Sequence, residues 1–206
     1  MLIRHLLFKK RTKMRPRLYL YLGFFVPIIF WTTTFVCGLI LDDYNHLKCL
    51  VSELGALGTP TQYLFTTGLI LSAFLNVFFT IGLWKYCKKL QLSIIPILLL
   101  SLYSSIAGPA IFPMPLRLHN IAGLPFPFLI LSPLIALWVW RKKEHLFKFR
   151  TVAIISLIIM MFGFLIFFPN VLNEYFGLKQ RFLYTGWTIW SVYLSYRFLK
   201  MANNET

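Results

Sequence analysis

The chain has 206 residues, of which 58% are hydrophobic and 13% are charged, and its formal net charge is +15. Soluble domains carry charge on roughly a quarter of their residues, so this composition excludes an ordinary soluble protein and indicates a membrane protein. The surplus of Lys and Arg would favour nucleic-acid binding in a soluble protein. Its distribution along the chain argues for membrane orientation instead, and we expect no nucleic-acid partner.

Six apolar stretches meet or approach the length that crosses a bilayer, about 20 residues for about 30 Å of hydrocarbon. They are Leu18–Leu41, Tyr63–Trp84, Leu92–Ile111, Ile121–Trp140, Val152–Phe168 and Phe182–Phe198. The last two are short. The sequence therefore predicts an all-α fold, a six-span transmembrane helix bundle that forms one membrane domain over residues 18–199.

The flanking segments differ in character. Residues 1–17 mix Leu and Phe with Arg and Lys, a pattern that fits a helix lying in the membrane interface and fits a disordered basic tail equally well. The first apolar stretch is too long for the core of a cleaved signal peptide, so we expect it to be retained. Residues 200–206 form a short tail.

Basic residues crowd every second gap between the stretches. Of the 21 Lys and Arg residues, only Lys48, Arg117, Lys179 and Arg181 lie in the other gaps. Basic loops stay in the cytoplasm, so this bias predicts that both termini are cytoplasmic, in a plasma (inner) membrane. The same residues suit an anionic leaflet, which attracts each nearby basic group by about 1 kcal/mol.

Prolines and small residues predict details of the bundle. Pro125, Pro127 and Pro133 lie inside the fourth stretch, so that helix is expected to be irregular and enclosed by protein, because proline removes a backbone donor. Asn76 is the most polar residue of the second stretch and is expected to form an interhelical hydrogen bond. Cys37 and Cys49 lie toward the same face; a pair between them is left open, with a packing role favoured for Cys37.

The polar residues that could carry chemistry are all expected at the external face. Glu53 and His119 could supply acid–base chemistry, with Ser52 as a further catalytic candidate. Basic side chains could hold a phosphate or carboxylate by bidentate hydrogen bonds. The candidate ligand-binding residues are Glu53, Arg117, His119, Asn120, Gln180 and Arg181. We expect Glu53, His119 and Arg181 to meet at one mouth of the bundle, and structural pairing explains them as well as function does.

Short motifs around these residues resemble a known family. They are Ser52-Glu53-Leu54-Gly55-Ala56 with Thr59-Pro60, Leu118-His119-Asn120, and Gly177-Leu178-Lys179-Gln180-Arg181 with Trp187. In this order they resemble the domain of unknown function 998 family of small polytopic membrane proteins, over most of Leu18–Leu199. Thr66-Thr67-Gly68 departs from the family pattern, in which an Asn before the Gly is more usual. The resemblance implies a six-helix fold and a shared external cluster, but no settled activity.

Three functions remain open from the sequence. The favoured one is an integral membrane protein whose external cluster binds a lipid head group or another amphiphile. The second is a membrane-embedded lipid hydrolase or transferase that uses Glu53 and His119, and the third is a non-catalytic subunit of a membrane complex. A membrane lipid is the expected partner, and a partner protein or a homo-oligomer is left open. No motif indicates a metal site, and the cofactor is unknown.

Overall fold

The structure, a computed structural model, describes residues 2–141 and 148–203, with side chains from residue 17 onward. Lys142, Lys143 and the end of the predicted tail, residues 204–206, lie outside the described residues. Within them the chain is all-helical, without a strand. The elements are α1 (Leu2–Ile40), η1 (Val51–Gly55), α2 (Gln62–Lys89), α3 (Ile95–Leu100), η2 (Ser101–Ile106), α4 (Ala107–Ile111), α5 (Arg117–Gly123), η3 (Phe126–Ile130), α6 (Leu131–Val139), α7 (Phe149–Gly163), η4 (Phe164–Phe167) and α8 (Phe176–Asn203), where η denotes a 3-10 helix.

Four helical segments in the described part of the chain are long and apolar enough to cross a membrane. They are Arg17–Ile40, Gln62–Lys89, Arg117–Val139 and Phe149–Phe167. They match the first, second, fourth and fifth predicted stretches. The third stretch corresponds to the shorter apolar helix Ile95–Ile111, and the sixth lies within α8, which is 28 residues long. The outer surface carries exposed apolar side chains such as Phe74 at 57% and Trp138 at 67%, as expected of a membrane protein.

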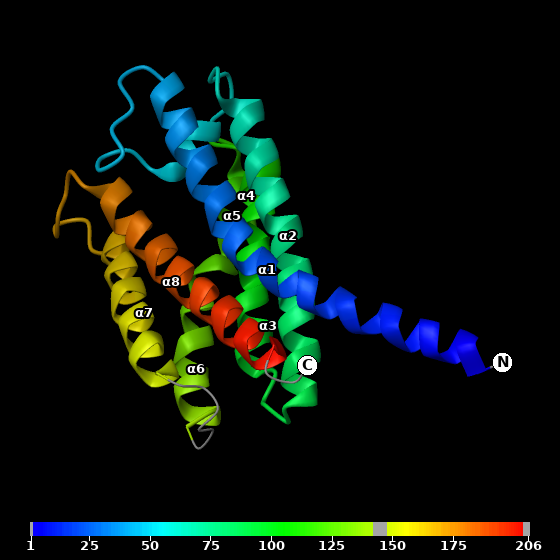
Figure 1. Cartoon of the computed structure of the whole chain (residues 1–206). Coiled ribbons are helices and arrows are strands. Elements are labelled where there is room, and N and C mark those ends of the chain that lie inside the picture. The colour runs from blue at the N-terminus through cyan, green and yellow to red at the C-terminus, as the bar shows by residue number, and fades with distance from the viewer. Residues whose placement is uncertain (1, 142–147, 204–206) are drawn as a thin grey trace.

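α8 is less apolar than the spans because protein, rather than lipid, covers much of it. It packs against α7 and α1 and also meets η1, η3 and η4, and in Figure 1 it lies between α7 and α1. Trp187 and Trp190 are fully buried on it, and Trp187 stacks on Tyr103 with 3.7 Å between ring centroids. Small residues let the helices approach closely: Ser195 Oγ donates to the Leu20 carbonyl at 2.6 Å.

The irregularity predicted from the prolines is confirmed, but the predicted enclosure by protein is wrong, since Leu124 is 63% exposed and Trp138 67% exposed. The fourth stretch divides into α5, η3 and α6, with breaks beside Pro125. The third stretch also changes helix type, at η2. Asn76 is fully buried and donates from Nδ2 to Ser104 Oγ at 3.0 Å, which is the predicted interhelical hydrogen bond. The parts of these two stretches that lie toward the η1 end, where the polar residues gather, are η2, α4, α5 and η3, whereas α3 and α6 lie toward the other end (Figure 1).

The bundle has two chemically different ends. The η1 end carries residues 41–61, 112–116 and 168–175, at the top of Figure 1. The basic end carries the last turns of α2 and α8 and the start of α7, and its described basic residues are Lys85, Lys88, Lys89, Arg141, Lys148, Arg150, Arg197 and Lys200. The N-terminal part of α1 extends away from the other helices (Figure 1).

Candidate functional site

Arg181 joins the start of α8 to the segment after α1. Its Nη1 donates to the Cys49 carbonyl at 3.1 Å, and its Nη2 donates to Tyr44 Oη at 2.8 Å and to His46 Nδ1 at 3.0 Å. Tyr44 Oη in turn donates to the Leu50 carbonyl at 2.9 Å. Arg181 is only 8% exposed. One buried guanidinium therefore satisfies three acceptors and fixes residues 44–50 on α8.

The titration of the two side chains that Arg181 contacts is altered. Burial is the largest effect on Tyr44 and raises the pKa of its phenol, which the Arg181 charge partly opposes. Burial, followed by the Arg181 charge, lowers the pKa of the His46 imidazole below its usual 6.5. Because His46 Nδ1 accepts from a guanidinium, which has no lone pair to offer, the neutral ring is the form that fits this contact.

Backbone contacts seat the first turn of α8 on the same segment. The amides of Gly177 and Leu178 donate to the carbonyls of Lys48 and Leu47 at 3.0 and 2.8 Å. A Cβ at Gly177 would clash with the Cys49 carbonyl oxygen and lie 2.7 Å from that of His46, so only glycine allows this approach. These carbonyls satisfy amides that a helix N-terminus otherwise leaves without partners.

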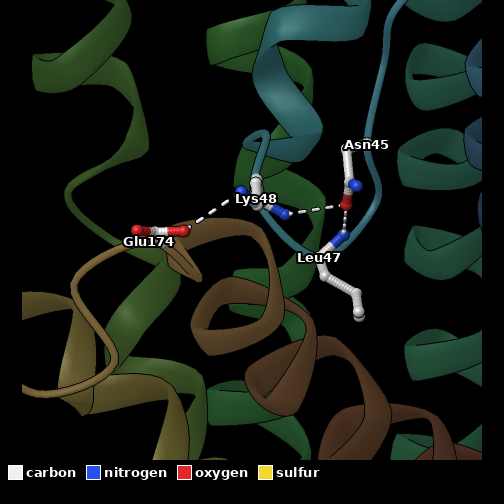
Figure 2. Close-up of polar contacts among 4 residues, drawn as sticks. All are labelled: Asn45, Leu47, Lys48 and Glu174. Atoms are coloured by element: carbon white, nitrogen blue, oxygen red, sulfur yellow. Dashed lines mark hydrogen bonds and ion pairs between the residues drawn. The ribbon is translucent and has the colours of Figure 1, made fainter.

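Polar contacts at the surface also join the segment after α1 to the loop before α8. Figure 2 shows Lys48 Nζ paired with Glu174 Oε2 at 3.0 Å, and Asn45 Oδ1 accepting from the amides of Leu47 and Lys48 at 2.9 and 3.2 Å. The Asn45 contacts form a local turn that shapes the segment. Lys48 and Glu174 are both well exposed, so the ion pair contributes little to stability.

Glu53 and Gln180 also bind backbone rather than one another. Glu53 Oε1 accepts from the Leu50 amide at 2.9 Å and so caps η1. Gln180 Oε1 accepts from the Val51 amide at 2.7 Å. That bond fixes the orientation of the Gln180 amide, because only its oxygen can accept, and it leaves the two donors of Nε2 without a hydrogen bond to a described residue.

His119 closes the end of α4. Its Nδ1 lies 2.9 Å from the Phe112 carbonyl and 3.2 Å from the Pro109 carbonyl. Carbonyls only accept, so Nδ1 must carry the proton. In the neutral ring Nε2 is then the acceptor, and no described residue donates to it.

Lys179 is fully buried, which the sequence did not indicate. Its Nζ donates to the Phe168 carbonyl at 3.2 Å and lies 4.5 Å from the centroid of the Phe176 ring. The ammonium thus bridges the loop that follows η4 and the start of α8, with a hydrogen bond and a cation–π contact in place of water.

Beside this junction lies a cavity of about 360 Å³. Its polar lining comes from Ser52, Thr66, His119, Asn120, Gln180 and the phenol of Tyr184, and the described lining residues include no Asp, Glu, Lys or Arg. Most of the wall is apolar: Val51, Phe65, Leu69, Ile106, Pro109, Ala110, Leu124, Phe126, Pro127, Phe164, Ile166, Phe167 and Leu183. The lining comes from η1, α2, η2, α4, α5, η3, α7, η4 and α8. Residues beside the breaks in the third and fourth stretches thus line one space.

The sequence was compared with models of known protein families. The model of the family described as "Protein of unknown function (DUF998)" matches residues 24–197, which is more than half of the chain. The chain belongs to this family. Searches of curated proteins and of solved structures found no match.

The motifs that resemble the DUF998 family converge in space. Gly177, Gln180 and Arg181 bind the segment before η1 or η1 itself, and His119 caps α4. Leu54, within the η1 motif, accepts from Thr61 Oγ1 through its carbonyl. The motifs therefore build the η1 end of the bundle, and much of the chemistry that the sequence offered is used to hold backbone in place.

The structure divides the predicted ligand-binding residues into two groups. His119, Asn120 and Gln180 line the cavity together with Ser52, whereas Glu53, Arg117 and Arg181 are outside its lining. Glu53, His119 and Arg181 each bind different partners, and no hydrogen bond or ion pair among the described residues joins the three. The expected pairing is not formed: Glu53 and His119 bind backbone groups, and Arg181 binds a backbone carbonyl, Tyr44 and His46.

Residues that sequence reasoning missed complete the site. Tyr44 and His46 bind Arg181 from 137 and 135 residues away along the chain, and no local pattern marks such a contact. Met114 accepts from Ser52 Oγ at 3.3 Å. Cys37 and Cys49 are free, not paired, and Cys37 is fully buried, as expected for a packing role.

Proposed function

We propose that this membrane protein binds an amphiphile in the cavity at the η1 end. The observation that carries the proposal is the division of the cavity wall, which is apolar over most of its area and carries hydrogen-bonding groups of Ser52, His119, Asn120 and Gln180. Sites for small organic ligands have this composition and volumes of about 300–1,000 Å³. The apolar wall would hold a hydrocarbon chain, and the polar groups would hold the head.

The surroundings of the cavity support a ligand that arrives from the bilayer. Exposed apolar side chains lie on the elements that form its wall, among them Tyr63 at 81% and Ile121 at 61%, and Phe167 of the wall is itself 65% exposed. An amphiphile could therefore keep its chain in apolar surroundings on the way in, which avoids the cost of passing it through water.

We further propose that the chain crosses a plasma (inner) membrane six times, with the basic end and both termini in the cytoplasm. The segregation of Lys and Arg to that end supports this orientation. α8 has 28 residues, about 42 Å of helix at 1.5 Å per residue, which exceeds the hydrocarbon thickness. The domain division then follows as residues 1–17, 18–199 and 200–206.

Photo-crosslinking with a panel of different head groups tests the binding proposal. The protein in membranes would be exposed to C16 amphiphiles that carry a diazirine in the chain and differ in their heads, and the labelled peptides would be mapped. At least one analogue should label the buried wall residues of segments 106–110 and 163–167, which are Ile106, Ala110 and Gly163. Labelling confined to the outer, lipid-facing residues with every analogue would reject the proposal.

A cavity-filling variant supplies the matched control. Gly123 lines the cavity, and the nearest atom to a Cβ placed there is 3.4 Å away, so Gly123→Leu adds bulk toward the open space. This variant should reduce labelling of the wall at least several-fold. Leu118→Phe, on the same helix but outside the lining and 49% exposed, should label like the parent.

The sequence-based alternative of a hydrolase or transferase has one supporting observation, since Ser52 and His119 line the same cavity. However, Ser52 Oγ donates to Met114 Sδ, and Glu53 is engaged with the Leu50 amide. A nucleophile requires a base within hydrogen-bond reach. Turnover of a labelled lipid ester that is abolished in Ser52→Ala would favour this alternative over simple binding.

A further inference from the structure

The cavity at the η1 end combines a free hydrogen-bond donor with a free acceptor. Gln180 Oε1 is occupied by the Val51 amide, which leaves its Nε2 hydrogens as donors. His119 Nδ1 is occupied by the Phe112 and Pro109 carbonyls, which leaves Nε2 of the neutral ring as an acceptor. Both residues line the cavity, and both free groups are fixed by bonds to backbone.

The charged side chains near the cavity do not line it. Arg181 follows Gln180 on α8 and is outside the lining. Its Nη1 and Nη2 donate hydrogen bonds to the Cys49 carbonyl, Tyr44 and His46. Arg117 is exposed and also outside the lining. A carboxylate or phosphate head in this cavity would lose its hydration without meeting a cation, which is strongly unfavourable.

We propose that the head group this cavity selects is an uncharged hydroxyl, as in a long-chain alcohol or a monoacyl- or diacylglycerol. This inference rests on the proposed binding function and specifies its ligand class. A hydroxyl accepts one hydrogen bond and donates another, so it suits a cavity that offers a donor on Gln180 and an acceptor on His119. The Asn120 amide, which lines the cavity without a hydrogen bond to a described residue, offers both kinds of group to a second hydroxyl.

Competition among heads on one chain length tests the selectivity. Hexadecanol, its methyl ether and palmitate at pH 7.5 would compete with a diazirine-bearing hexadecanol for labelling of segments 106–110 and 163–167. The alcohol should compete about three- to tenfold better than the ether, which is the range expected for one net hydrogen bond. Palmitate should be weaker than the alcohol by at least about tenfold, since its carboxylate finds no cation in the lining.

A variant at His119 isolates the acceptor. In His119→Asn the side-chain amide nitrogen can take the place of Nδ1 toward the Phe112 carbonyl, while no atom replaces Nε2. The preference for alcohol over ether should fall, because the acceptor that we assign to the alcohol hydrogen is lost. His119→Gln, which can place its carbonyl oxygen where Nε2 lies, should restore part of that preference, which a purely structural role of His119 would not predict.

The outcomes separate this inference from the binding proposal. If no C16 analogue labels the cavity wall, the binding proposal itself fails. If analogues label the wall but palmitate competes as well as hexadecanol, or the methyl ether does, the cavity binds amphiphiles without selecting a hydroxyl, and this inference alone is overturned.

Discussion

At the scale of single residues, the polar side chains of the η1 end form most of their hydrogen bonds with backbone groups. Arg181, Glu53 and Gln180 all bind main-chain groups of residues 49–51. Buried polar groups must be paired, so a 3-10 helix held between membrane helices requires such side chains. The atoms that these bonds do not use, Gln180 Nε2 and His119 Nε2, are the ones that we propose bind the ligand.

Arg181 should therefore matter to stability more than any other basic residue at this end. Arg181→Ala leaves Tyr44 and the Cys49 carbonyl without a buried donor, and we expect it to lower the free energy of unfolding by about 2–3 kcal/mol. Arg117→Ala is the matched control: Arg117 is exposed at the same end, and its loss should cost less than about 0.5 kcal/mol. Thermal unfolding in detergent measures both, and equal midpoints for the two variants would contradict the structural role.

The contact between Arg181 and His46 predicts a pH dependence. The folded-state pKa of His46 is lowered by burial and then by Arg181, so the unfolded chain binds the proton more readily. Stability from this contact is therefore present above the unfolded pKa of about 6.5 and is lost as pH falls through and below that value. The other titratable group at the contact is Tyr44, which stays neutral in this range because its pKa is raised.

Comparison with a variant isolates the His46 contribution. His46→Asn keeps an acceptor for Arg181 in Oδ1 and removes the titration. The thermal midpoint of the parent, relative to this variant, should fall between pH 7.5 and pH 5. A parent that follows the same pH profile as the variant would show that His46 does not carry the effect.

At the scale of helices, the sequence predicted where a helix is interrupted better than it predicted which helices pack together. Prolines foretold the irregular fourth stretch, since the missing amide acts locally. The first turn of α8 could not be predicted in the same way. Its buried residues are small or basic: Gly177, Lys179 and Arg181. Gly177 and Arg181 contact residues 46–49, more than a hundred residues away along the chain, and Lys179 contacts Phe168, just after η4. Burial of that kind depends on tertiary partners that no local window contains.

Close approach between α7 and α8 gives a prediction at this scale. A Cβ at Gly186 would lie 2.6 Å from the Ser156 carbonyl oxygen and would clash with Met160 Cγ. Because one of these atoms is helix backbone, Gly186→Ala should lower the free energy of unfolding by about 1–3 kcal/mol. Gly123→Ala, where the nearest atom is 3.4 Å from the new Cβ, should cause no loss. Thermal unfolding of the two variants would test the contact, and similar midpoints would contradict it.

At the scale of the whole molecule, the two ends of the bundle have different chemistry. Apart from Lys48, Arg117 and the two basic residues in the first turns of α8, the described basic side chains lie at the basic end or on α1. The cavity and its hydrogen-bonding groups lie at the η1 end. The sequence predicted that the polar candidates and most basic residues lie at opposite ends, but the cavity itself could not be predicted, because nine elements contribute to its wall.

Orientation follows from this division and can be measured by cysteine labelling. In a background with Cys37, Cys49 and Cys87 replaced by Ala, single cysteines would be introduced at exposed sites. Those at the η1 end are Lys48, Arg117 and Asn173, and those at the basic end are Lys88, Arg141 and Lys200. Lys179 is unsuitable because its side chain is fully buried.

With the basic end in the cytoplasm, an impermeant maleimide should label intact cells only at Lys48→Cys, Arg117→Cys and Asn173→Cys. The other three variants should react only after permeabilisation, since basic loops are retained on the cytoplasmic side. Arg117→Cys is the informative site for the number of crossings, because the 17-residue segment Ile95–Ile111 is about 26 Å long, slightly less than the hydrocarbon thickness. External labelling at Lys88→Cys would invert the orientation, and protection of Arg117→Cys alone would remove the third and fourth crossings together, because Lys88 and Arg141 would then lie on the same side as Arg117. Protection of Asn173→Cys with labelling at Lys200→Cys would place α8 the wrong way round.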